Sequence, residues 1–152
     1  MALEIERKFL VRGDGWPRAG GIRFVQGYLA SGPEGVVRVR IAGPEAFLTI
    51  KSGGTGLVRQ EFEYPIPLAD AEALLPLCGG RVVEKVRCRQ EFSGHVWEVD
   101  RFLGANEGLV LAEVELEEAG IDPPRPAWVG AEVTGDIRYY SSRLAEKPFT
   151  AW

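Results

Sequence analysis

The chain has 152 residues, of which 45% are apolar and 26% are charged, and its net charge at pH 7 is −4. This length and composition favour a single globular domain, residues 1–152, and exclude an intrinsically disordered chain. The acidic net charge also excludes nucleic-acid binding through overall charge, so any phosphate site must be a local basic patch.

The first predicted element is a strand over residues 3–11. It contains the run Glu-Ile-Glu-Arg-Lys at positions 4–8. Successive side chains of a strand point to opposite faces, so Glu4, Glu6 and Lys8 share one face. Two carboxylates about 7 Å apart on one face can together hold a hard divalent cation. A charged strand at this position also argues against a signal peptide.

Seven further segments have the period-2 pattern of strands, with turns rich in glycine and proline between them. The predicted strands are 22–30, 36–41, 46–51, 57–66, 82–92, 96–102 and 109–116. A helix is predicted over 70–77, ended by Gly79 and Gly80, and helical structure is predicted after Thr134. The run Ser52–Gly56 is predicted to be a hairpin turn, because it lacks the lysine of a phosphate-binding loop. Eight antiparallel strands fit a closed barrel, which leaves no unpaired edge.

Charged residues recur on one face of most of these strands, and they are grouped by sign. The residues concerned are Arg38, Arg40, Lys51, Arg59, Glu61, Glu63, Lys85, Arg87, Arg89, Glu98, Asp100, Glu113, Glu115 and Glu117. Two arrangements fit this pattern. The barrel has either an apolar interior with a solvated charged surface or a polar interior that pairs its charges or binds ions. The grouping by sign weakens the case for a solvated charged surface, because a surface selected for solubility tends to mix its charges.

The bulky residues of the opposite face include Phe9, Phe62, Tyr64 and Trp97. With a polar interior, we expect them to pack against flanking helices outside the barrel. Trp97 could equally form a contact between two copies of the chain, so a homodimer stays open.

Three further features bear on the compartment and on other chemistries. Cys78 and Cys88 form no Cys-x-x-Cys unit and are expected to be reduced thiols. No apolar run reaches the roughly 18 residues of a membrane helix. His95 is predicted to be solvated in a hairpin turn, which argues against a catalytic role. We therefore expect a cytoplasmic protein.

An ordered set of motifs resembles the CYTH superfamily, also called the triphosphate tunnel metalloenzymes. The set contains Glu4-x-Glu6-x-Lys8, Gln26-Gly27-Tyr28-Leu29, Arg38-Val39-Arg40, Leu48-Thr49-Ile50-Lys51, Arg59-x-Glu61-x-Glu63, Glu84-Lys85-x-Arg87, Trp97-Glu98-Val99-Asp100-x-Phe102, Ala112-Glu113-Val114-Glu115-Leu116 and Gly135-Asp136-x-Arg138-Tyr139. It spans nearly the whole chain and is most similar to the bacterial inorganic triphosphatase-like members. Ser141 departs from the pattern, since many relatives have asparagine there. The resemblance implies a mainly β (α+β) fold: an eight-stranded antiparallel closed barrel that forms a tunnel, with a few flanking helices and a C-terminal plug-like helix.

The resemblance also implies roles for individual residues. The implied metal ligands are Glu4, Glu6, Asp100, Glu113 and Glu115. The implied substrate-binding residues are Lys8, Arg38, Arg40, Lys51, Arg59, Lys85, Arg87 and Arg138. Glu4, Glu6, Lys8 and Lys85 are expected to act in catalysis, and Glu61, Glu63 and Tyr28 to support the site. The expected cofactor is Mg²⁺ or Mn²⁺, with two ions when substrate is bound.

The reaction implied by the resemblance is hydrolysis of a triphosphate by metal-activated water inside the charged barrel. Inorganic triphosphate is the leading substrate. Three alternatives stay open: a class IV adenylate cyclase that makes cyclic AMP from ATP, a thiamine triphosphatase, and a module that binds polyphosphate without turnover. The expected partner is therefore a small polyanion, with no nucleic acid and no membrane.

Overall fold

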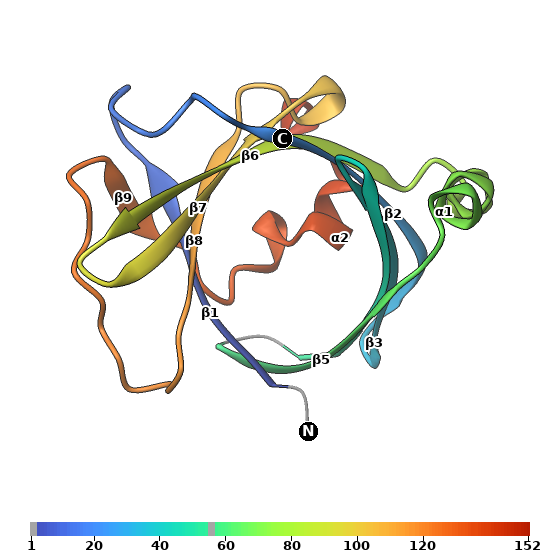
Figure 1. Ribbon diagram of the computed structural model, residues 1–152, viewed down its shortest axis with the longest axis horizontal. Helices are drawn as coiled ribbons and strands as arrows, with labels where there is room; N and C mark the ends of the chain where they lie inside the picture. Colours follow the sequence, from blue (N-terminus) through green and yellow to red (C-terminus); the bar gives the residue numbers. More distant parts are fainter. Residues whose placement is uncertain (1–2, 55–56) are drawn as a thin grey trace.

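The computed structural model, which describes residues 3–54 and 57–152, shows nine strands, eight of which close into an antiparallel barrel (Figure 1). The strands are β1 (Leu3–Val11), β2 (Ile22–Gly32), β3 (Gly35–Ala42), β4 (Glu45–Ser52), β5 (Val58–Pro65), β6 (Val82–Phe92), β7 (His95–Phe102), β8 (Val110–Glu115) and β9 (Val129–Glu132). The predicted eight-stranded barrel is confirmed. The additional strand β9 pairs with the end of β1; its four residues follow a proline-rich segment that shows no alternation in the sequence.

The order of the strands around the barrel differs from their order in the chain. The neighbours run β1-β5-β4-β3-β2-β6-β7-β8 and return to β1. Residues 3–5 of β1 pair with β5, whereas residues 6–10 pair with β8. This division of β1 between two neighbours closes the barrel and removes its free edges.

The helical elements are short and lie outside the sheet or across its opening. They are α1 (Leu68–Leu74), the 3₁₀ turns η1 (Leu75–Cys78), η2 (Gly104–Asn106), η3 (Ile137–Tyr139) and η4 (Phe149–Ala151), and α2 (Ser141–Leu144). The helix predicted over 70–77 is therefore present as α1 and η1, and Gly79 ends it with φ of 62°. The predicted late helix consists of η3 and α2, and Figure 1 shows α2 across the opening of the barrel. Among the described residues, no helix is long and apolar enough to cross a bilayer.

The largest apolar cluster lies on the outside of the barrel wall. Phe9 and Trp97 are fully buried in it, with ring centroids 5.4 Å apart. Trp128, just before β9, packs edge-on against Trp97 at 6.1 Å. The segment between β8 and β9 thus covers Trp97 within the same chain, which removes Trp97 as a contact between two copies.

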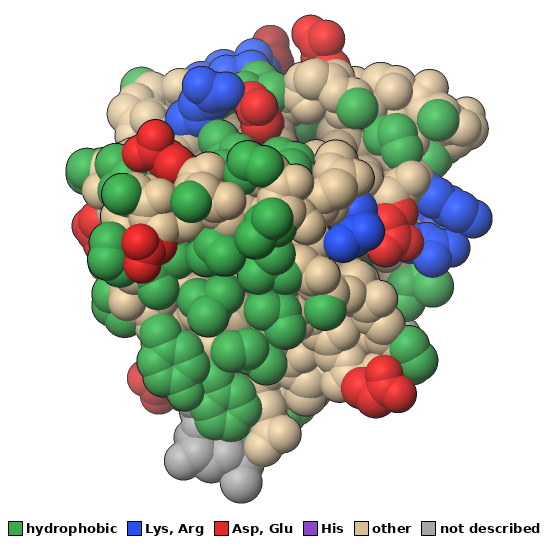
Figure 2. Space-filling view, turned by 90° about the vertical axis from the view of Figure 1, so that its right-hand side faces the viewer, with side chains coloured by type: hydrophobic (Ala, Val, Ile, Leu, Met, Phe, Trp, Pro, Cys, Tyr) green, Lys and Arg blue, Asp and Glu red, His purple; other side chains and the backbone are tan. Residues whose placement is uncertain are grey.

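Other parts of the outer face remain uncovered. Figure 2 shows the side of the molecule that carries α1, where hydrophobic side chains gather over a broad area. Phe62 and Tyr64 of β5 are 38% and 53% exposed. The prediction that flanking helices cover these two residues is wrong, because α1 has only seven residues and packs mainly on β3 and β4.

Several smaller predictions can be compared with the structure. Cys78 and Cys88 are free thiols, as predicted, and both are buried. His95 is the first residue of β7 and is half-buried, whereas a solvated turn position was predicted. The predicted turn Ser52–Gly56 includes Thr55 and Gly56, which lie outside the described residues.

Candidate active site

The interior of the barrel holds a charged cavity of about 250 Å³. Side chains from the inward face of the strands line it, as the alternation along each strand requires. Its charged lining residues are Glu4, Glu6, Lys8, Arg38, Arg40, Lys51, Arg59, Glu61, Glu63, Lys85, Arg87, Arg89, Glu98, Glu113 and Glu115. Of the two arrangements that fit the sequence, the structure therefore has the polar interior.

Four glutamates from β1 and β8 form an acidic group within this cavity. The register of the two strands sets Glu6 opposite Glu115 and Lys8 opposite Glu113. Burial, and then the charges of Glu113 and Glu4, raise the pKa of Glu6 to about 8. Burial, and then the charge of Glu4, also raise the pKa of Glu115. Burial and the neighbouring carboxylates thus oppose ionisation of Glu6 and Glu115.

The chemistry of the acidic group fits a hard divalent cation, because all four side chains offer carboxylate oxygens. Among residues 3–54 and 57–152, no three acidic, histidine or cysteine side chains converge to form a ready-made metal cluster. A hard divalent cation can also be held by one or two carboxylates, with substrate phosphates and water completing its coordination.

Two lysines connect the acidic group to the rest of the cavity. The Lys8 ammonium lies 3.5 Å from Glu113, and the Lys51 ammonium lies 3.0 Å from Glu4 and 3.3 Å from Glu61. Although burial opposes ionisation, Lys8 and then Arg87 hold the pKa of Glu113 well below its ordinary value. Glu113 is thus ionised at neutral pH.

Asp100 holds two basic residues of β6 in place. One of its oxygens accepts a hydrogen bond of 2.6 Å from Lys85, and Arg87 binds both oxygens at 2.7 and 2.8 Å. Asp100 is only 1% exposed and is absent from the cavity wall. The structure therefore places Asp100 as an anchor for Lys85 and Arg87, and its role as a metal ligand stays a prediction.

Lys85 itself is almost completely buried, with 2% exposure. Burial lowers the pKa of its ammonium to about 8, and Asp100 opposes this effect. Burial therefore disfavours the charged form of Lys85, and the buried carboxylate of Asp100 both stabilises that charge and orients the ammonium group.

Arg38 and Arg40 on β3 supply positive charge that the protein only partly compensates. Arg38 donates to Thr49 at 3.3 Å, and Thr49 in turn donates to Glu63 at 3.0 Å. The Nε of Arg38 is buried without a hydrogen-bond partner among the described residues. Arg38 also lies 3.6 Å from the Glu63 carboxylate, whereas Arg40 donates to Gln26 at 2.8 Å and forms no ion pair with the acidic residues that the structure describes. Both guanidinium groups thus retain capacity for an anion.

The C-terminal segment, residues 134–142, also contributes to the cavity wall. Its Tyr140 ring lies 5.4 Å from both the Lys8 ammonium and the Arg59 guanidinium carbon. Thr134, Ser141 and Ser142 also belong to the cavity wall. Tyr28 of β2, which was predicted to support the site, also lines the cavity. It is 2% exposed and accepts a hydrogen bond of 3.4 Å from Gln26.

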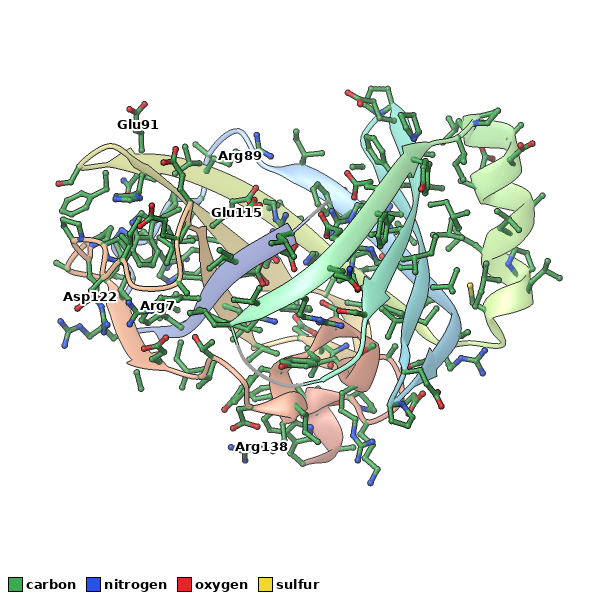
Figure 3. All side chains as sticks on the ribbon, turned by 90° about the horizontal axis from the view of Figure 1, so that it is seen from below. Arg7, Arg89, Glu91, Glu115, Asp122 and Arg138 are labelled. Carbon is green, nitrogen blue, oxygen red and sulfur yellow. The ribbon has the colours of Figure 1, made fainter. Side chains whose placement is uncertain are left out.

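Arg138, a predicted substrate-binding residue, lies outside the cavity wall. Its side chain is 62% exposed and forms an ion pair of 2.7 Å with Asp136. Figure 3 shows Arg138 at the edge of the molecule, pointing away from the barrel. Asp136 caps η3 through the backbone N–H of Arg138, and this local turn directs the guanidinium outward.

Some lining residues were not among the predicted site residues. Arg89 and Glu98 share the alternation of Arg87 and Asp100, so the strand pattern contained the signal for both. Tyr140, Ser141 and Ser142 lie in a short helical segment that strand periodicity cannot place. Their position at the cavity depends on how the C-terminal segment folds back on the barrel.

Comparisons with known proteins agree with this geometry. The CYTH domain family model matches residues 2–147, a range that includes every residue of the cavity wall. Proteins named inorganic triphosphatase from Acetivibrio thermocellus and Nitrosomonas europaea are 45% and 43% identical to this chain. These alignments cover 98% and 93% of the chain and 97% and 96% of the two relatives. A crystal structure of an inorganic triphosphatase has a TM-score of 0.68 at 38% identity, with 95% of each chain covered.

Proposed function

This chain belongs to the CYTH domain family, and we propose that it is a metal-dependent hydrolase that cleaves inorganic triphosphate to pyrophosphate and phosphate. The observation that carries the proposal is the division of the cavity. Carboxylates of β1 and β8, of which burial and like charge disfavour the ionisation of Glu6 and Glu115, share the cavity with guanidinium groups of β3 that retain capacity for an anion. A complex of a divalent cation with a polyphosphate matches both groups at once.

The triphosphatases of this family are metal-dependent. In this chain, Glu4, Glu6, Glu113 and Glu115 are the residues that would hold the metal, which we propose is Mg²⁺ or Mn²⁺, with two ions when substrate is bound. When bound, such a metal neutralises phosphate charge and lowers the pKa of water.

Seven basic residues of the cavity position the triphosphate and stabilise its charge. They are Lys8, Arg38, Arg40, Lys51, Arg59, Lys85 and Arg87, all of which line the cavity. Phosphoryl transfer leaves little covalent work for a protein, so catalysis depends on positioning and on charge stabilisation. Lys85 and Arg87 are held by Asp100 before substrate arrives, so their orientation costs little at the moment of reaction.

The cavity wall supports inorganic triphosphate over ATP or thiamine triphosphate. Most of the residues that line the cavity are charged. The other residues of the described wall are Tyr28, Val36, Leu57, Thr134, Gly135, Tyr140, Ser141 and Ser142. Tyr28 and Tyr140 both lie against polar or cationic groups of the site. This wall matches phosphate oxygens better than a nucleobase or a thiazolium ring.

The cytoplasmic location stays a prediction from the sequence.

We expect metal-dependent phosphate release that is fastest with inorganic triphosphate. Phosphate release from inorganic triphosphate, ATP and thiamine triphosphate is measured with Mg²⁺, with Mn²⁺ and with EDTA, and cyclic AMP is measured in the ATP reaction. EDTA should abolish the release because the acidic group then lacks its cation. Cyclic AMP without phosphate release would instead make the chain a cyclase, and binding without any turnover would make it a polyphosphate-binding module.

Arg138→Ala should leave hydrolysis nearly unchanged, in contrast to a substitution within the cavity. Because Arg138 is exposed and forms its ion pair with Asp136 outside the cavity wall, we expect KM for inorganic triphosphate to change by less than about twofold. Arg38→Ala is the matched comparison, since it removes a guanidinium from the cavity wall. A tenfold rise of KM in Arg138→Ala would return this residue to the substrate site.

A further inference from the structure

Phe24 is a buried aromatic residue on the charged inner face of the barrel. It lies on β2, on the same face as Gln26 and Tyr28, and is 6% exposed. Its register partners are Ala42 on β3 and Lys85 on β6. Side chains directly opposite each other in an antiparallel pair are in contact range, and those two positions further along remain within reach of an aromatic ring.

Three cations surround this ring. The guanidinium carbons of Arg40 and Arg87 both lie 4.8 Å from its centroid, and the Lys85 ammonium lies at 5.8 Å. The face of an aromatic ring carries negative partial charge and attracts cations, most strongly where water is excluded. Phe24 therefore contacts, on one ring, three of the residues proposed to bind triphosphate.

Arg40 depends most on this contact. Lys85 and Arg87 share the carboxylate of Asp100, but Arg40 has no ion pair among the described residues. It donates a hydrogen bond to the side-chain oxygen of Gln26. Burial, and then the charges of Arg38 and Arg87, lower the pKa of Arg40 to about 9, so its charge is disfavoured where it stands. An attractive ring face beside it opposes this repulsion.

We propose that Phe24 is a positioning residue of the triphosphate site: its ring holds Arg40 and Arg87 side by side, with Lys85 beside them, before the substrate enters. The proposal rests on the proposed function for the identity of the substrate. The physical role is preorganisation, because a cluster of like charges that is already assembled does not have to be brought together during binding.

Phe24→Leu tests this role, since leucine keeps an apolar side chain and removes the ring face. Phe9→Leu is the matched control. Phe9 is a fully buried phenylalanine that also contacts two guanidinium groups, those of Arg7 and Arg125 at 5.6 and 4.6 Å, but it lies in the outer cluster. Both substitutions lose aromatic packing, and only Phe24→Leu loses contact with the cations of the cavity.

We expect Phe24→Leu to raise KM for inorganic triphosphate about tenfold and to change kcat much less, because the ring acts on binding. Phe24→Tyr should restore KM to within about twofold of the wild-type value, because tyrosine keeps the ring face. Phe24 also lines a surface hollow with Ala19, Gly20 and Phe47, which leaves room for the added hydroxyl. Phe9→Leu should lower the melting temperature without raising KM.

Calorimetric binding of inorganic triphosphate in EDTA separates this proposal from the proposed function, because it requires neither metal nor turnover. Phe24→Leu should bind about tenfold more weakly than the wild type, and Phe9→Leu equally tightly. Phe24→Met serves in the same way if the leucine variant does not fold. Wild-type binding in EDTA, combined with no hydrolysis when Mg²⁺ or Mn²⁺ is supplied, would overturn the proposed function alone. Equal affinity of the wild type and the leucine or methionine variant, or an equal loss in Phe24→Tyr, would overturn the role of Phe24.

Discussion

Glu6→Gln should nearly abolish hydrolysis of inorganic triphosphate and, at the same time, stabilise the metal-free protein at pH 8. The loss of activity follows from the proposed role of Glu6, because an amide is a weaker ligand for a hard divalent cation than a carboxylate. We expect kcat/KM to fall by at least about 100-fold. The gain in stability follows from the surroundings of Glu6, where burial and the charges of Glu113 and Glu4 disfavour ionisation.

The pH dependence of this gain has a definite sign. The pKa of Glu6 is about 8 in the folded protein and 4.5 for an ordinary glutamate. Between these values the folded protein holds a proton that the unfolded chain has released. The contribution of Glu6 to the free energy of unfolding therefore falls as the pH rises from 4.5 to 8. Glutamine does not titrate in this range. The free energy of unfolding of Glu6→Gln should therefore exceed that of the wild type by an amount that grows with pH, on the order of 1–4 kcal/mol at pH 8.

Urea unfolding in EDTA at pH 5, 6.5 and 8 measures this difference. The raised pKa values of Glu4 and Glu115 act in the same direction, but these residues are present in both proteins. Glu91→Gln is the matched control, because Glu91 is exposed and points away from the barrel in Figure 3. If Glu6→Gln is no more stable than the wild type at pH 8, the folded protein does not disfavour ionisation of Glu6 as we infer.

Lys85→Met should reduce turnover by about 100- to 1,000-fold while leaving the protein nearly as stable as the wild type. The loss of turnover follows from removing a preorganised charge from the cavity wall. The stability is kept because Asp100 retains both hydrogen bonds from Arg87, at 2.7 and 2.8 Å, so no buried charge is left unpaired. Methionine also fills nearly the same volume and removes the cost of burying an ammonium.

Lys147→Met is the matched control, because Lys147 is exposed and is the one lysine of the sequence that does not line the cavity. Steady-state kinetics and urea unfolding are measured on both variants. A loss of more than about 3 kcal/mol of stability with turnover retained would mean that Lys85 serves the fold and not the reaction.

The strand pattern of the sequence determined much of the candidate site. Glu4, Glu6 and Lys8 share one face, as do Arg38 and Arg40, because alternation along a strand is a local property of the extended backbone. The sequence therefore predicted most of the charged lining before any contact between distant strands was known. It also predicted the number of barrel strands, because glycine and proline mark the turns between the alternating segments.

Only the tertiary structure decided which face of each strand lies inside the barrel. Alternation is the same for a charged interior and a charged surface, and the choice depends on what covers the other face. Here the segment between β8 and β9 buries Phe9 and Trp97 outside the wall, so the charges of β1 and β7 point inward. The closure of β1 against both β5 and β8 was equally undetermined, because such pairing joins residues far apart in the chain.

The roles of individual charges within the site also depend on tertiary contacts. Asp100 continues the pattern of Glu98 along β7, yet its oxygens are bound by Lys85 and Arg87 from the neighbouring strand. Arg138 belongs to a motif of the late helical segment, yet a turn capped by Asp136 directs it to solvent. The sequence by itself determined which side chains share a face of a strand, since that follows from the local geometry of the backbone. Which partners each charge meets was decided by the pairing of distant strands and by the path of the C-terminal segment.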